Sequence, residues 1–228
     1  MAERRLITGF SNPTVKFLRS LRDKKHRKAA GRFLAEGLRL LTDARESGHL
    51  PEMLVMSTSR DPHQLLDRLE ADVLAAGGEV LELAPDLLAK ITGKDNPQAV
   101  AGVFTEFDTA LTNLDRSAAK IWLVAQALRD PGNLGTMLRT GDAVGAGGLI
   151  LIDDCADPFS AEAVRASMGA VFTQKIGQAR WDEFLPWLRG GAGQLVAASL
   201  RDAVDYRSAP YAAPCFLMVG NESRGLPE

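Results

Sequence analysis

The stretch from Ile121 to Ala146 constrains the fold of this chain more than any other part of the sequence. Its first residues, Ile121–Ala125, form an apolar run that is typical of a buried strand. An Asp-Pro-Gly-Asn turn follows at residues 130–133, and apolar side chains then recur at helical spacing, with Asn133 expected as the helix N-cap. This strand–turn–helix unit predicts an α/β fold with an anion site near Arg139; the alternative is an ordinary crossover in which Arg139 is only solvated.

Strands and helices alternate along the rest of the chain, which predicts two α/β domains. We expect the first domain at residues 1–107, a polar linker at 108–119 and the second domain at 120–228, and a length of 228 residues is sufficient for two buried cores. The other expected strands are residues 32–36, 53–56, 79–83, 100–107, 148–152, 194–199 and 215–219, and the other expected helices are residues 12–25, 38–44, 62–76, 85–91, 158–170 and 181–188.

The composition is that of an ordinary globular protein, with 46% hydrophobic and 25% charged residues. No apolar run reaches transmembrane length and the charged N-terminus lacks a signal-peptide stretch, so we expect a cytoplasmic protein without membrane attachment. Cys155 and Cys215 lie in or beside apolar runs, which favours buried thiols in a reducing compartment. His26, His49 and His63 have no zinc spacing to these cysteines, so we expect no metal.

Positive charge is concentrated at the N-terminus. Residues 1–32 carry ten Lys and Arg side chains and two acidic ones, whereas the whole chain has a net charge of −2. This block predicts a surface that binds a polyanion, with nucleic acid favoured over the alternative of a solvated helix face. The candidate RNA-binding residues are Lys16, Arg19, Lys24, Lys25, Arg27 and Lys28.

A second polar loop follows the apolar run Cys215–Val219. Gly220 and Gly225 bracket this loop, and Glu222 within it can accept a hydrogen bond from a hydroxyl or orient a cation. Loops beyond the strands of α/β sheets are where such folds bind ligands, so we expect a binding loop here; a plain turn at the end of a strand is the alternative.

Taken together, these two loops resemble the first two signature motifs of the SpoU/TrmH RNA methyltransferases, a family of the SPOUT superfamily. The first motif, Asn-x-Gly-x-x-x-Arg, matches Asn133, Gly135 and Arg139, and the second, Gly-x-Glu-x-x-Gly, matches Gly220, Glu222 and Gly225. The N-terminal part is similar to the family's substrate-binding domain, which is related to small ribosomal RNA-binding proteins. The residues that carry this second similarity are Asn12-Pro13, Val15-Lys16, Phe33-Leu34, Glu36-Gly37 and Asn96-Pro97-Gln98.

The resemblance implies methyl transfer from S-adenosylmethionine to a ribose 2′-hydroxyl of rRNA or, less favoured, tRNA. It also implies a homodimer and a parallel-sheet catalytic domain that ends in a trefoil knot. By position, the implied catalytic residues are Arg139, Asn133 and Glu222, and the implied donor-binding residues are Ser199, Leu200, Gly220, Asn221 and Gly225. The family's third motif is expected shortly after Glu228 and is absent, so we expect an incompletely represented chain in which the knot and donor binding are incomplete.

The chemistry leaves two roles open for Arg139. Neither motif contains a His, Cys or Lys that could take the proton of the hydroxyl, and a guanidinium rarely gives up its own proton. We therefore expect Arg139 to orient the hydroxyl or a phosphate and to stabilise developing negative charge, with direct action as a base as the alternative.

Two other functions compete with methyl transfer. A noncatalytic RNA-binding protein of the same fold is the main alternative. A nicotinamide oxidoreductase is disfavoured because Gly141, Gly145 and Gly147 lie at the end of a predicted helix, whereas the dinucleotide fingerprint opens one.

Overall fold

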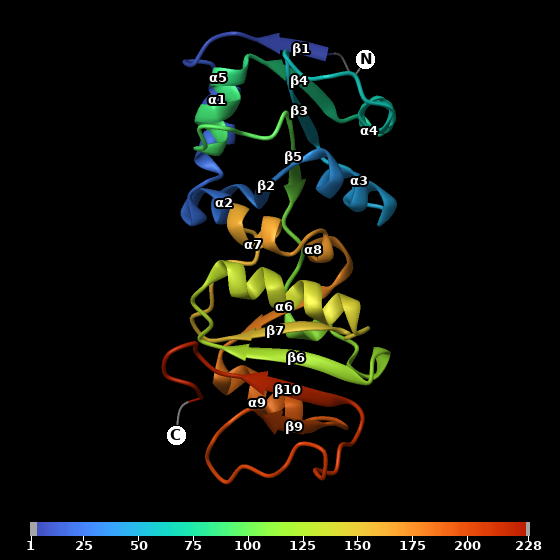
Figure 1. The fold of residues 1–228 in the computed structure, drawn as a ribbon, viewed down its shortest axis with the longest axis vertical. Coiled ribbons are helices and arrows are strands. Elements are labelled where there is room, and N and C mark those ends of the chain that lie inside the picture. Colours follow the sequence, from blue (N-terminus) through green and yellow to red (C-terminus); the bar gives the residue numbers. More distant parts are fainter. Residues whose placement is uncertain (1–3, 227–228) are drawn as a thin grey trace. The chain divides into compact units, whose positions relative to one another are not determined.

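The computed structural model describes residues 4–226, and its chain divides into two compact units (Figure 1). The first unit comprises residues 1–106 together with 159–165, and the second comprises residues 107–158 together with 166–228. Each unit contains its own five-stranded sheet.

The first unit is built on a mixed sheet with the strand order β1-β4-β3-β5-β2. The pairs β1–β4 and β4–β3 are parallel, whereas β3–β5 and β5–β2 are antiparallel. Its strands are β1 (Arg4–Ile7), β2 (Arg32–Glu36), β3 (Met53–Ser57), β4 (Glu79–Leu83) and β5 (Val100–Thr105), and its helices are α1 (Pro13–Ser20), α2 (Lys24–Ala30), α3 (Leu38–Glu46), α4 (Gln64–Ala75) and α5 (Pro85–Thr92).

Helices α1 and α5 pack side by side on one face of this sheet (Figure 1). The apolar stripe of the predicted N-terminal helix, Val15, Leu18 and Leu21, is buried in the core beneath them. The single helix predicted over residues 12–25 is wrong, because Asp23 has extended backbone and its carboxylate accepts a hydrogen bond from the Lys25 amide at 2.7 Å. An aspartate in this position caps a new helix, so α2 begins where a continuous helix was expected.

The second unit is an all-parallel sheet with the order β8-β7-β6-β10-β9, which confirms the predicted parallel catalytic-type sheet. Its strands are β6 (Ile121–Gln126), β7 (Gly148–Ile152), β8 (Lys175–Ala179), β9 (Gln194–Ala197) and β10 (Cys215–Val219), and the helices along this part of the chain are η1 (Leu111–Asn113), η2 (Arg116–Ala118), α6 (Pro131–Ala143), α7 (Ala161–Ala166), α8 (Ala170–Thr173) and α9 (Trp181–Arg189). Because β6 lies between β7 and β10, the direction of strand succession changes at β6. Ligands bind at such switch points in open α/β sheets.

Two elements of this part differ from the sequence prediction. The helix expected over residues 158–170 is interrupted, because Met168 and Gly169 have left-handed backbone with φ of 51° and 96°, and two short helices result. Strand β8 was not predicted, because this short edge strand, Lys-Ile-Gly-Gln-Ala, has neither an apolar run nor a clear alternation of polar and apolar residues.

Within residues 4–226, none of the helices combines the length and apolar character that a membrane span requires. The same residues contain no group of three or more His, Cys, Asp or Glu side chains that could hold a metal ion. The thiols of Cys155 and Cys215 are both free, and burial raises the pKa of each.

Candidate active site

The loop after β10 is bonded directly to the turn before α6. The Glu222 carboxylate accepts hydrogen bonds from the backbone amides of Arg129 at 3.3 Å and Asp130 at 3.0 Å. The Asn221 side-chain amide donates to the Ala127 carbonyl oxygen at 2.9 Å. These bonds join segments more than 90 residues apart in the sequence, so the two motif loops form one structure.

The start of α6 orients Asn133 toward this cluster. The predicted N-cap at Asn133 is wrong: Asp130 is the N-cap, and its carboxylate accepts a hydrogen bond from the Asn133 amide at 2.6 Å. The reason is Pro131, whose fixed φ and missing amide suit the first helical position, so the cap is the residue directly before it, Asp130. The Asn133 side chain is left to hydrogen-bond with Glu222.

Glu222 is held in its ionised form. Desolvation raises the pKa of this carboxyl, but hydrogen bonds from the Asp130, Glu222 and Arg129 amides and from the Asn133 side chain together outweigh it and lower the pKa. A carboxylate with a lowered pKa is a poor proton acceptor near neutral pH. Its chemistry here is that of a fixed acceptor that holds the two loops together.

The Gly220–Gly225 loop is a tight turn closed on itself. The backbone amides of Asn221 and Gly225 each donate to the other's carbonyl, at 3.0 and 2.9 Å. The Asn221 side-chain oxygen also accepts from the backbone amides of Ser223 and Arg224, both at 3.1 Å. A Cβ atom at position 220 would lie 2.2 Å from the Gly225 carbonyl carbon, so the turn closes only around glycine.

A cavity of about 560 Å³ adjoins this turn at the carboxyl ends of β6, β7 and β10, which is the switch point of the sheet. This volume lies within the roughly 300–1,000 Å³ range of small-molecule sites. The residues that line it are Gln126, Ala127, Arg129, Asp153, Asn221, Ser223, Arg224 and Gly225.

Asp153 supports the wall of the cavity opposite the turn. It has left-handed backbone with φ of 60°, and its carboxylate accepts hydrogen bonds from the Trp181 backbone amide at 2.9 Å and the Gln126 side-chain amide at 3.0 Å. Asp153 and Asp154 directly follow the apolar run at residues 148–152, and this position beyond a strand is the sequence signal for Asp153. Gln126 and Arg129 carried no comparable signal, because only the strand order brings them to the cavity.

Of the predicted catalytic and donor-binding residues, Asn221 and Gly225 line the cavity. Gly220, Glu222 and Asn133 belong to the two joined loops without lining it, and the other three predicted residues lie elsewhere. Ser199 and Leu200 follow β9 as exposed loop residues, and neither is among the described residues that line the cavity. Arg139 lies six residues beyond Asn133 on α6, which corresponds to about 9 Å along the helix and about 120° around it. Its exposed guanidinium forms no ion pair or side-chain hydrogen bond within residues 4–226.

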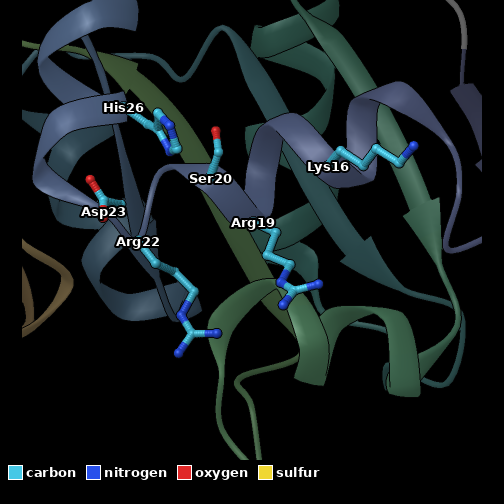
Figure 2. Close-up of a pocket in the computed structure, with 6 residues that line it drawn as sticks. All are labelled: Lys16, Arg19, Ser20, Arg22, Asp23 and His26. Carbon is cyan, nitrogen blue, oxygen red and sulfur yellow. The ribbon is translucent and has the colours of Figure 1, made fainter.

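The basic N-terminal block forms a separate surface on the first unit. Figure 2 shows a hollow of about 470 Å³ lined by Lys16, Arg19, Ser20, Arg22, Asp23 and His26. The side chains of Lys24, Lys25 and Lys28 are exposed but lie outside this lining.

Arg27 does not belong to the exposed basic surface. It is only 3% exposed, and its guanidinium donates to the carbonyl oxygens of Leu21 and Arg22, both at 2.8 Å. The prediction that Arg27 contacts RNA is therefore wrong: its charge stabilises the bend between α1 and α2.

The geometry defines the class of the protein. A parallel sheet with a small-molecule cavity at its switch point, joined to a unit with a basic surface, is the arrangement of an α/β enzyme that acts on a polyanion.

Comparisons with known proteins identify the family. Residues 120–228 match the SpoU rRNA Methylase family, and residues 12–102 match the MRM3-like substrate binding domain. The AdoMet-bound rRNA methyltransferase from Sinorhizobium meliloti is 40% identical with a TM-score of 0.90, over 98% of this chain and 84% of that chain. The 23S rRNA (guanosine(2553)-2′-O)-methyltransferase RlmP of Bacillus subtilis is 30% identical, over 96% of this chain and 84% of its own length.

A third similar protein is the SpoU methyltransferase AviRb from Streptomyces viridochromogenes in complex with the cofactor AdoMet, which is 26% identical with a TM-score of 0.85 over 95% of this chain and 84% of that chain. The chain belongs to the SpoU rRNA methylase family. Its membership confirms the family that the two motifs indicated.

Proposed function

We propose that this chain methylates rRNA at the cluster formed by Asn133, Glu222 and the two loops that they join. The chain is an S-adenosylmethionine-dependent RNA 2′-O-methyltransferase. The observation that carries the site is the pair of hydrogen bonds from the Arg129 and Asp130 amides to Glu222. These bonds turn two distant motifs into one wall of a cavity at the switch point of the sheet.

The loop of residues 220–225 is the proposed wall of the donor site. S-adenosylmethionine carries a carboxylate, an ammonium group and ribose hydroxyls, and the cavity offers partners for each kind of group: the guanidiniums of Arg129 and Arg224, the Asp153 carboxylate and the backbone of the turn at Asn221 and Gly225. The donor set therefore fits the cofactor. When bound, the cofactor supplies an electrophilic sulfonium methyl group, which requires a nucleophile held in line with it.

We assign Ser199 and Leu200 to the proposed donor site from their position in the sheet. They follow β9, which is the parallel neighbour of β10, so they emerge at the same edge as Gly220. Their exposure is compatible with contact to a bound molecule, and their assignment rests on the family's pattern.

Arg139 is the proposed catalytic residue that interacts with the ribose 2′-hydroxyl. Among residues 4–226, no His, Cys or Lys lines the cavity, and the Glu222 carboxylate is a weak base because its pKa is lowered. A guanidinium stays protonated in proteins, so Arg139 acts by orienting the 2′-hydroxyl or its neighbouring phosphate and by stabilising developing negative charge. Asn133, already bonded to Glu222, borders the nucleotide in this arrangement.

We also propose that the enzyme is a homodimer that works in the cytoplasm on rRNA rather than tRNA. The MRM3-like substrate binding domain and the names of the relatives support rRNA. The exposed and otherwise unpaired position of Arg139 supports a site completed by a second subunit, and the free thiols of Cys155 and Cys215 are compatible with a reducing compartment. Light scattering of the purified protein tests the dimer.

Transfer of tritium from labelled S-adenosylmethionine to rRNA, followed by mapping of 2′-O-methyl sites in cells with and without the intact gene, tests the function. We expect one site to lose its methyl group when the gene is deleted. An unchanged methylation map, together with donor binding but no transfer in vitro, would instead support a noncatalytic RNA-binding protein.

A further inference from the structure

A groove between α1, α2 and α5 on the first unit is not used by the reaction itself. The hollow in Figure 2 adjoins a second one of about 360 Å³, and Arg19 and Arg22 line both. Because the two hollows share these residues, they lie next to each other beside α1, and we refer to them together as the groove. The Lys and Arg side chains along it are Lys16, Arg19, Arg22, Lys90 and Lys94.

The two arginines that line both hollows have no partner in the described part of the chain. The guanidinium groups of Arg19 and Arg22 form no ion pair or side-chain hydrogen bond with residues 4–226, and Figure 2 shows both extending to the same side of α1. Of the two acidic residues in the lining, Asp23 already accepts a hydrogen bond from the Lys25 amide as the cap of α2. The groove therefore carries a net positive charge with two guanidiniums available to an anion.

Lys90 and Lys94, on the α5 side of the groove, each contact a neighbouring side chain. Lys94 forms an ion pair at 2.8 Å with Glu36, whose side chain is 6% exposed. Lys90 lies over the ring of Phe10 at 4.3 Å from its centroid, and Phe10 itself is 45% exposed. A positive groove with an exposed aromatic side chain at its edge is the arrangement by which proteins bind single-stranded nucleic acids.

The position of Arg22 depends on a glycine. Gly93 is the left-handed C-cap of α5 with φ of 70°, and a Cβ atom there would lie 2.2 Å from the Arg22 guanidinium carbon. The guanidinium thus rests directly on the Gly93 backbone. It lies at the C-terminal end of α5, where unpaired carbonyl groups and the helix dipole favour a cation.

We propose that this groove binds the sugar–phosphate backbone of a single-stranded segment of the rRNA, with a phosphate held by Arg19 and Arg22. Gly93 is a positioning residue, because its missing side chain gives Arg22 the room to face that phosphate. The inference rests on the proposed function, since it names where the same substrate binds outside the catalytic cavity.

Binding of a 23S rRNA fragment, measured at several salt concentrations, tests the groove. Arg22→Ala should weaken binding about tenfold and reduce the slope of log affinity against log salt by about one. Arg68→Ala is the matched control, because Arg68 is an exposed arginine on α4 outside the groove and removes the same charge. Equal effects of the two substitutions would overturn the proposal.

The role of Gly93 has its own control. Gly93→Ala and Gly77→Ala impose similar backbone strain, since φ is 70° and 83°, but a Cβ at 77 meets no atom within 4 Å. We expect the melting temperature of both variants to fall by a similar amount. Only Gly93→Ala should weaken RNA binding. In an Arg22→Ala background Gly93→Ala should cause no further loss, because it acts through Arg22.

The outcomes separate this inference from the proposed function. Suppose that the unaltered protein transfers methyl groups to rRNA and that Arg22→Ala binds RNA as Arg68→Ala does. RNA binding by the groove is then refuted, whereas the proposed methyltransferase function is supported. If the unaltered protein transfers no methyl groups to rRNA, the proposed function itself is contradicted. Equal loss of RNA binding in Gly93→Ala and Gly77→Ala would reduce Gly93 to a structural residue and refute its positioning role.

Discussion

Glu222 is the residue whose substitution most directly tests the union of the two loops. Its carboxylate accepts hydrogen bonds from the Arg129 and Asp130 amides at 3.3 and 3.0 Å and another from the Asn133 side chain. A net hydrogen bond contributes about 0.5–1.5 kcal/mol to stability, and the exposure of Glu222 places these bonds at the lower end of that range. Glu222→Ala should therefore cost about 1–1.5 kcal/mol of unfolding free energy.

The loss of activity should exceed the loss of stability. Without Glu222 the turn at residues 129–130 is no longer held against the loop after β10, and Asn133 loses its partner. Since about 1.4 kcal/mol corresponds to a factor of ten in rate, a misplacement of both loops worth about 3 kcal/mol predicts a fall in kcat/KM of roughly a hundredfold. Glu222→Gln keeps one acceptor oxygen, so its kcat/KM should lie between the values of the unaltered protein and of Glu222→Ala.

The contribution of Glu222 to the free energy of unfolding should depend on pH. The pKa of Glu222 is lowered in the folded protein, so its contribution to stability is present above the usual glutamate pKa of about 4.3 and is lost as the pH falls through the folded value. Urea unfolding of the unaltered protein and of Glu222→Gln should therefore differ at pH 7 and converge below about pH 4. Glu162→Gln is the matched control, because Glu162 is an exposed carboxylate on α7 with no partner in the described part of the chain. A Glu222→Ala protein with unaltered kcat/KM and no change in its pH-dependent stability would refute the reasoning.

Three further predictions concern Arg139 and the basic residues of the first unit. Arg139→Lys should lower turnover at least a hundredfold while RNA affinity is kept, because a point charge does not replace a planar guanidinium; tritium transfer and filter binding measure both, and a near-normal rate contradicts the assignment. Neutralising Lys24, Lys25 and Lys28 together should lower RNA affinity and its salt slope, whereas unchanged values would limit RNA contact to the groove. Arg27→Ala should instead destabilise the first unit by about 2–3 kcal/mol, because it leaves two carbonyl groups without their donor, and a melting temperature equal to that of Lys28→Ala would contradict its structural role.

The sequence was most informative where local pattern and burial coincide. The apolar run at residues 121–125 became the central part of the parallel sheet, and the runs at 148–152 and 215–219 became its two neighbours. An apolar run of this length has few alternatives to a strand buried on both faces. The two motifs identified the enzyme class and its methyl donor, and the family membership of the chain confirms both.

Sequence reasoning failed where one residue changes the local geometry. Asp23 interrupts what reads as a continuous basic helix, and Pro131 moves the cap of α6 from Asn133 to Asp130. The short edge strands β1 and β8 lack an apolar run, because an edge strand buries fewer side chains than a central one. For these two strands the strand period is too weak a signal over four or five residues.

By itself, the sequence determined the strand–turn–helix units, the polar loops that follow the strands and the concentration of positive charge near the N-terminus. Only the tertiary structure decided which loops meet. The insertion of β10 beside β6 brings Glu222 to the amides of residues 129 and 130, and the packing of α5 beside α1 brings Gly93 beneath Arg22. The physical reason is that hydrophobic periodicity specifies which face of an element is buried, whereas the partners of its polar groups depend on strand order and helix packing between distant parts of the chain.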